Sequence, residues 1–198
     1  MSKSLANISL RVPGRWNPHI FTPDWLVGNV VAPVWGKDVP ELGAAFNFAD
    51  GQMAYQVNDI LLIPAQDALN ATVRCPNDTS VEKLRQMGKM VRLILELLPH
   101  TRIKGLGCNF VYRIDEPDVS GLLDAMGQCT PPSSFWLAAA TFRKPLEGRL
   151  LNAIMTRPVD GEAKWQLELN FHYEHATDFS EDSLVENASV AEEVIHGN

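Results

Sequence analysis

The sequence predicts an α+β protein built around a curved antiparallel sheet, with its helices packed on one face of that sheet. Three observations indicate this fold class. Short runs of alternating apolar and polar residues recur along the chain, as in half-buried strands. One strongly amphipathic helix pattern separates these runs at residues 79–98. Turn signals such as Asp50-Gly51 join neighbouring runs, which favours antiparallel hairpins.

The first part of the chain, residues 1–100, is expected to form a strand, a helix, several strands and a second helix. Apolar and polar residues alternate at 5–12, which predicts the first strand. Thr22 followed by proline is typical of a helix start, and we expect Gly28 and Pro33 to keep that helix short. The next strands are predicted at 44–48, 53–57, 60–64 and 69–75.

The helix at 79–98 is the clearest element of the sequence. Thr79 and Glu82 form a capping-box pattern at its start, and Pro99 is expected to stop it. Its apolar stripe is broad, which predicts deep burial against the sheet.

The second part, residues 101–178, is expected to share the same sheet. A strand is predicted through Leu106–Ile114, where alternate side chains are apolar, and the glycines before it suggest close approach of another chain segment. A short helix is expected at 118–127. Three further strands are predicted at 134–142, 150–157 and 163–174, with a loop at 144–149 and a turn at 159–161. Residues 179–198 are expected to form an acidic C-terminal helix or tail capped by Ser180.

Both parts share the order of strand, helix, strands and helix, so we expect two similar halves whose strands join into one sheet. This order of elements resembles that of the duplicated saddle of TATA-box-binding proteins. The resemblance concerns element order alone, and a shared fold does not transfer function.

Composition indicates a cytoplasmic protein. The N-terminus lacks a secretory signal pattern, and no continuous apolar stretch is long enough to span a membrane. The cysteines Cys75, Cys108 and Cys129 are widely spaced and form no zinc-binding pattern. We therefore expect no metal, no cofactor and no membrane partner.

Charge is concentrated at the C-terminus. The formal net charge is −7, and residues 174–198 carry seven acidic side chains but no Lys or Arg, so the remainder sums to zero. Such a segment repels nucleic acid. It could be a solvated helix face, a contact for a basic partner, or a cover for the protein's own basic surface.

Two groups of residues are candidate binding sites. Aromatic residues gather early in the chain, where they could form a recognition surface or plug the open end of the sheet. They are Trp16, His19, Phe21, Trp25 and Trp35. Basic residues follow the exposed side of helix 79–98 and the next strand, where they could contact phosphates or form an ordinary solvated face. They are Arg85, Lys89, Arg92 and Lys104.

His172 and Glu174 are weak catalytic candidates. The period of two in 163–174 places them together on the polar face of a strand, with Glu168 and Asn170 further along it. His175 falls on the opposite face, so the two histidines cannot chelate one metal within a regular strand. A solvated or ligand-binding strand face and a hydrolytic His–Glu pair both remain open.

We therefore expect a protein-binding or self-associating assembly module without catalytic activity, using the aromatic segment and the acidic tail. The first alternative is a nucleic-acid-binding protein that uses the basic residues of helix 79–98. The second is a hydrolase that uses His172 and Glu174.

Overall fold

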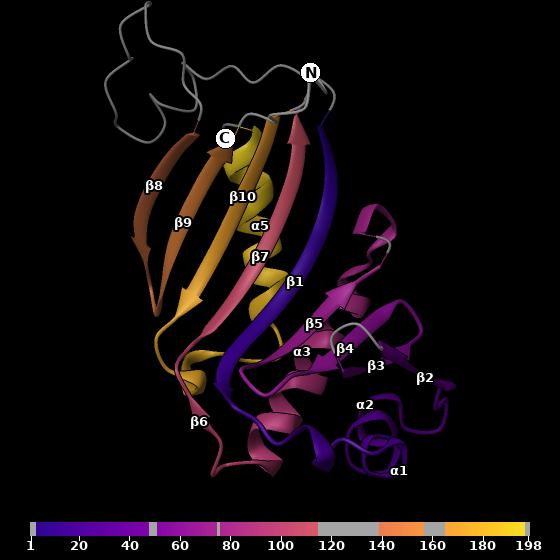
Figure 1. Cartoon of the computed structure of the whole chain (residues 1–198). Coiled ribbons are helices and arrows are strands. Elements are labelled where there is room, and N and C mark those ends of the chain that lie inside the picture. The colour runs from indigo at the N-terminus through magenta and orange to yellow at the C-terminus, as the bar shows by residue number, and fades with distance from the viewer. Residues whose placement is uncertain (1–2, 48–50, 75, 115–138, 157–164, 197–198) are drawn as a thin grey trace, which may run out of the picture.

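The computed structural model describes residues 3–47, 51–74, 76–114, 139–156 and 165–196, and it confirms the predicted α+β class with a large antiparallel sheet (Figure 1). The strands are β1 (Lys3–Arg15), β2 (Leu42–Asn47), β3 (Gln52–Val57), β4 (Ile60–Pro64), β5 (Ala68–Val73), β6 (Arg102–Ile103), β7 (Leu106–Ile114), β8 (Ala139–Leu146), β9 (Arg149–Thr156) and β10 (Trp165–Tyr173). The main helices are α1 (Pro23–Leu26), α2 (Ala32–Trp35), α3 (Val81–Leu97) and α5 (Ser183–His196). The helix predicted at 118–127 and the turn predicted at 159–161 lie outside the described residues.

The ten strands form one sheet in the order β2-β3-β4-β5-β1-β7-β10-β9-β8, with β6 paired to the end of β1. All of these pairings are antiparallel. The long strand β1 is central because it pairs with β5 on one side and with β7 on the other. It thereby joins the strands of the first and second parts of the chain into one sheet.

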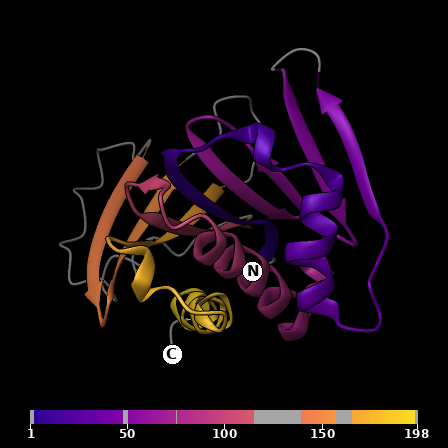
Figure 2. The same ribbon diagram turned by 90° about the horizontal axis from the view of Figure 1, so that it is seen from below.

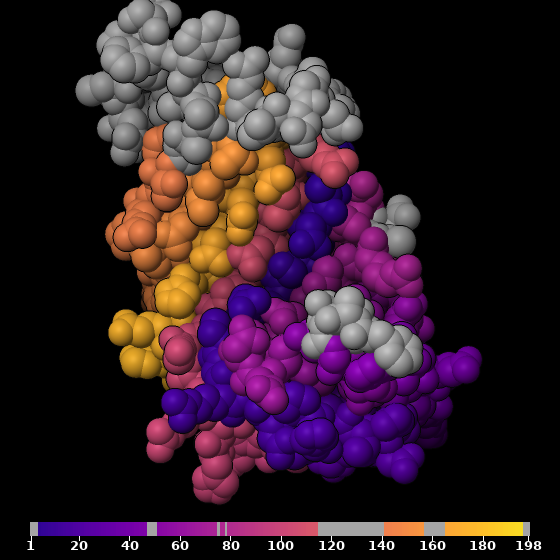
Figure 3. All heavy atoms as spheres, in the orientation of Figure 1, coloured from indigo at the N-terminus to yellow at the C-terminus, as the bar shows by residue number. Residues whose placement is uncertain are grey.

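The helices lie on one face of the sheet, as the sequence predicts (Figure 2). Helices α3 and α5 contact each other across this face, and α5 also contacts β7. On the opposite face, the described parts of β1, β7, β10 and β9 run as diagonal bands along the surface without helices over them (Figure 3). In the described residues the sheet therefore has a helix-covered face and an opposite face without helices, which is called the helix-free face below.

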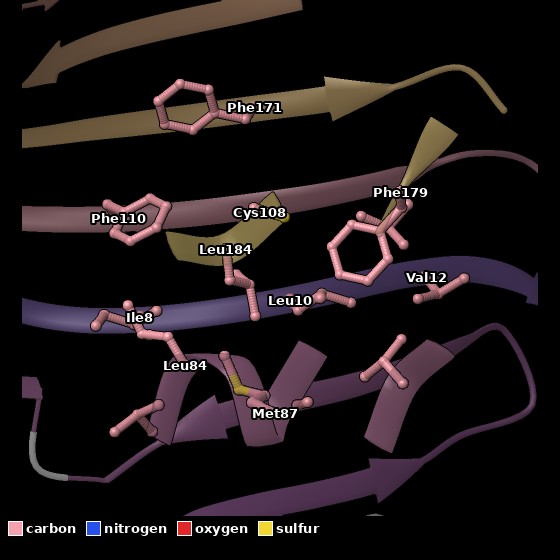
Figure 4. Close-up of a cluster of buried hydrophobic side chains, with 14 of the residues drawn as sticks. Ile8, Leu10, Val12, Leu84, Met87, Cys108, Phe110, Phe171, Phe179 and Leu184 are labelled. Atoms are coloured by element: carbon pink, nitrogen blue, oxygen red, sulfur yellow. The ribbon is translucent and has the colours of Figure 1, made fainter. Parts of the chain in front are cut away.

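The core fills the space between the sheet and its helices. Strand β10 follows the predicted alternation, with Leu167, Leu169 and Phe171 fully buried and the residues between them partly exposed. Phe171 meets Phe110 of β7 edge to face, with 5.8 Å between the ring centres. Side chains from β1, β7, β10, α3 and α5 meet in this cluster (Figure 4). Burial of these alternating apolar side chains fixes the register of the strands.

The helical segment between β1 and β2 is longer than predicted. It runs from Pro23 to Trp35 because a π-type turn, Val27–Val31, joins α1 to α2. In that turn the Ala32 N–H donates to the Val27 carbonyl, five residues earlier. This widened turn accommodates Pro33, which lacks an N–H and would crowd a regular helix. The helical segment therefore continues through Gly28 and Pro33, which were expected to limit it to two or three turns.

Two predicted boundaries also shift. The cap of α3 is Ser80, not Thr79, and the Ser80 hydroxyl accepts a hydrogen bond from the Lys83 N–H. The loop predicted at 144–149 is largely strand: β8 and β9 continue to a two-residue turn at 147–148, where Gly148 has φ +69°. Glycine adopts this left-handed conformation readily, which permits the tight turn.

Candidate functional site

The aromatic segment is largely part of the core. Trp16 and Phe21 are buried, at 5% and 1% exposure, and the Trp16 indole N–H donates to the Val12 carbonyl at 2.9 Å. Phe21 contacts Trp16 and Trp25, with ring centres 6.1 and 5.4 Å away. The side chains of Trp16 and Phe21 therefore pack inside this fold, as in the core-plug alternative.

The other aromatic candidates are more accessible. Trp25 and Trp35 are half-buried against the core, and His19 is exposed. His19 also lines an open groove of about 670 Å³ together with Pro18, and Phe46 and Met53 form another part of its wall. A binding role for His19, Trp25 and Trp35 stays a prediction.

Two basic residues of α3, Arg85 and Arg92, contact the segment that leads into α5. Arg85 pairs with Asp182 at 2.8 Å, in the segment that leads into α5. Arg92 pairs with Glu96 at 2.7 Å and donates to the Phe179 carbonyl at 3.3 Å. One acidic residue of the C-terminal region, Asp182, therefore contacts the basic residues of α3. A covering role for the acidic tail as a whole stays a prediction.

The two remaining basic candidates are separated. Lys89 is half-buried beside Arg92 in a small hollow that Glu96 and Glu181 also line. Lys104 is exposed on the chain between β6 and β7, where its N–H donates to the Pro13 carbonyl. A nucleic-acid interface at Arg85, Lys89, Arg92 and Lys104 stays a prediction.

His172 lies on the helix-free face, over the glycines that precede and begin β7. A Cβ at Gly105 would lie 3.0 Å from the His172 ring and from the Tyr173 carbonyl, and Gly105 has φ +139°. The expected close approach at these glycines is therefore confirmed. Glu174 is exposed just after β10, and among the described residues no hydrogen bond joins it to His172. The hydrolase alternative stays a prediction.

A row of asparagines crosses the helix-free face. Asn170 of β10 lies opposite Asn109 of β7 and Asn152 of β9. The Asn170 amide donates to Asn109, and the Asn152 amide donates to Asn170 at 3.3 Å. The sequence shows each asparagine at an outward position of its strand, but the row depends on strand order. These hydrogen bonds pair some of the polar side-chain groups on this face with each other.

A second polar cluster is buried between the sheet and α5. The Asn187 side chain is fully buried, and its amide lies 3.1 Å from the Tyr173 hydroxyl. Burial raises the pKa of the adjacent Cys108 thiol from 9.0 to about 12, against the opposing effect of a hydrogen bond with Asn187. The thiol is therefore neutral near pH 7 and is a poor nucleophile. This cluster anchors α5 to the sheet.

Within the described ranges, no group of three or more His, Cys, Asp or Glu side chains is arranged to hold a metal ion. In the same residues no helix is both long and apolar enough to cross a membrane.

The least protected feature of the described chain is the edge of the sheet at β2. Among the described strands, β2 and β8 are the two ends of the sheet, and Figure 2 shows β2 at its outer margin. Strand β2 has the sequence LGAAFN, without charge or proline. Ala44 and Ala45 are exposed, and Phe46 is 46% exposed. Val39, just before this strand, is 41% exposed.

The opposite edge has a different composition. Strand β8 carries Arg143, Lys144 and Pro145 in succession, and all three are exposed. Charged side chains and proline on an edge strand oppose the addition of another strand, because they hinder pairing of the backbone. Of the two described ends of the sheet, only β2 has small or apolar, uncharged side chains beside its open backbone edge. This composition favours the addition of another strand.

Sequence reasoning missed this edge. The residues of β2 are visibly uncharged in the sequence, but only the strand order shows that they form an end of the sheet. An apolar strand in the middle of a sheet already pairs with a strand on each side and has no open edge.

Comparison with known proteins gives no further indication of function, since no family model matches the chain and no curated protein is significantly similar to it.

Proposed function

We propose that this protein is a binding or assembly module that acquires an additional strand at β2. The observation that carries this proposal is the contrast between the two ends of the sheet. Strand β8 has two cations and a proline, whereas β2 has small or apolar side chains along its exposed edge. Proteins that remain single in solution commonly protect both edges with charges, proline or a covering segment.

Strand addition supplies affinity through the backbone. An edge strand directs alternate N–H and C=O groups away from its sheet, and an extended segment can pair with them. Side chains of the added strand then contact the surface beside the edge. The groove lined by Phe46 and Met53 lies at the end of β2 and offers such a contact.

A peptide titration tests strand addition at β2. The probe is a fluorescein-labelled peptide with the sequence of residues 41–47, and the readout is its fluorescence anisotropy with increasing protein. We expect saturable binding. The same peptide with a fully N-methylated backbone should not bind, because it lacks the N–H groups that pair with an edge.

A pair of variants locates the binding. The double variant Ala44→Lys/Ala45→Lys places one charge on each face of the sheet at β2. The control, Thr141→Lys, adds a charge at an exposed position of β8. The first variant should weaken peptide binding and the second should not. Equal binding of the peptide and its N-methylated form, or no binding to a chain that is monomeric, would contradict the proposal.

We also propose that the two parts of the chain are related halves, as their element order suggests. In support, β1 is flanked outward by β5, β4, β3 and β2, and β7 is flanked outward by β10, β9 and β8. A long helix follows the last strand of each part. The cytoplasmic location remains a proposal from composition.

A further inference from the structure

We infer that the strand added at β2 is the β2 strand of a second copy of this chain, which forms a two-fold symmetric dimer with one continuous sheet. This inference rests on the proposed function. The two copies of β2 would run antiparallel, with the symmetry axis at Ala44.

The sequence of β2 is compatible with itself in this register. An axis at Ala44 places Leu42 of one copy opposite Phe46 of the second copy, on the side of the sheet that carries the helices. The pairing within the chain shows this side, because Leu42 and Ala44 lie opposite Val57 and Tyr55, which are buried under the helices. The two apolar side chains would then extend each other's core.

The same register places small residues on the helix-free side. Gly43 of one copy would lie opposite Ala45 of the second copy, so no bulky side chain separates the two backbones there. An axis between Ala44 and Ala45 would instead pair residues of opposite faces and would place the two helix layers on opposite sides of the joined sheet. Axes at Gly43, Ala44 or Ala45 all keep both cores on one side, and among them only the axis at Ala44 pairs Leu42 with Phe46.

Charge also permits the pairing of two copies. Residues 42–46 carry no charge, so no like charges would lie opposite each other within the paired strands. Glu41, just before β2, would lie opposite the uncharged Asn47 of the second copy. A strand that carried Lys or Glu near its centre would oppose its own copy across the axis.

The composition of β8 explains why the assembly would stop at two copies. Pairing β2 with β2 consumes the open edge of both copies and leaves a β8 strand at each end of the joined sheet. Both ends then carry Arg143, Lys144 and Pro145, which oppose further addition. An interface that uses the same surface of both subunits closes, whereas pairing of β2 with β8 would propagate into fibres.

Sedimentation velocity of the full chain tests the dimer. At micromolar concentration the wild-type chain should sediment with twice the 22.0 kDa mass of one chain. Ala44→Lys places two lysines against each other at the axis and should raise the dissociation constant at least about tenfold. Thr141→Lys, on the β8 edge, should leave the dimer intact.

Charge complementation makes the test specific to the register. Ala44→Glu alone should also dissociate the dimer, but an equimolar mixture of Ala44→Lys and Ala44→Glu chains should restore it as a heterodimer. Only residues that face each other across the two copies give this rescue. The rescue also shows that neither substitution prevents the native fold from forming in the dimer.

The outcomes separate this inference from the proposed function. A monomeric wild-type chain, or a dimer that Ala44→Lys does not weaken, would overturn the inference. If the β2 peptide still binds in that case, strand addition stands and its natural partner is another protein. If the chain is monomeric and the peptide does not bind, the inference and the proposed function both fail.

Discussion

Gly88 of α3 provides a sharp test of how the C-terminal region packs. A Cβ built on Gly88 would lie only 2.4 Å from the Glu181 carbonyl oxygen, and 3.2 and 3.3 Å from the carbonyl carbon and the Cα of Glu181. All three are backbone atoms, so no side chain can rotate away. We predict that Gly88→Ala destabilises the protein, because residue 181 must move to accommodate the methyl group.

The magnitude follows from two opposing effects. Alanine in place of glycine stabilises a helix by about 0.8–1.0 kcal/mol. Ordinary contact begins near 3.4 Å, so the 2.4 Å contact requires a shift of about 1 Å. Overpacking of this kind costs about 1–3 kcal/mol. The net expectation is a loss of about 1 kcal/mol in the free energy of unfolding.

Gly28 supplies a matched control. It is also a helical glycine, and a Cβ there would meet nothing within 4 Å. Gly28→Ala should therefore gain up to about 1 kcal/mol, and the difference between the two variants should be about 1–3 kcal/mol, which isolates the overpacking cost. Urea denaturation at one protein concentration measures both variants. If Gly88→Ala is stabilised as much as Gly28→Ala, the close approach of α3 to residue 181 is wrong.

Two further predictions concern the contacts of α5. Asn187→Leu leaves the buried Tyr173 hydroxyl without its amide partner and should cost about 1–3 kcal/mol, measured by urea denaturation. Adding Tyr173→Phe to Asn187→Leu should recover part of that loss. If the losses of the two single variants simply add in the double variant, the Asn187–Tyr173 hydrogen bond is contradicted. Burial, followed by the charge of Glu192, raises the pKa of Tyr112 above its ordinary 10.0. The contribution of the neutral Tyr112 phenol to the free energy of unfolding is therefore fully present below pH 10. It declines above pH 10, because the phenol loses its proton in the unfolded chain at a lower pH than in the folded chain. Tyr112→Phe should flatten the fall in stability above pH 10, and an unchanged pH profile would refute the assignment.

The strands were predictable because burial imposes a period of two on their sequence. In β10, the large residues Leu167, Leu169 and Phe171 all lie inside, as their alternation indicates. The same reasoning explains His172, whose outward position follows from its neighbours. The apolar face of α5 was also readable, with Leu184 and Ala191 fully buried.

The features that the sequence did not reveal depend on contacts distant along the chain or on local backbone choices. Ser80 and Thr79 are chemically equivalent caps, and only the backbone conformation selects Ser80. The π-type turn before Pro33 has no pattern of its own. Strand order decides which strands become edges, and periodicity carries no information about that order. For this reason the β2 edge was not a candidate site, whereas the buried Trp16 was.

Hydrogen–deuterium exchange at several protein concentrations tests the central claim most directly, because it reports whether the β2 edge is occupied. The account predicts that amides of residues 42–46 become more protected as concentration rises, while those of residues 141–144 and 146 in β8 exchange at a constant rate. Exchange in β2 that is independent of concentration, in a chain that remains monomeric, would contradict the proposal that β2 joins two copies of this protein.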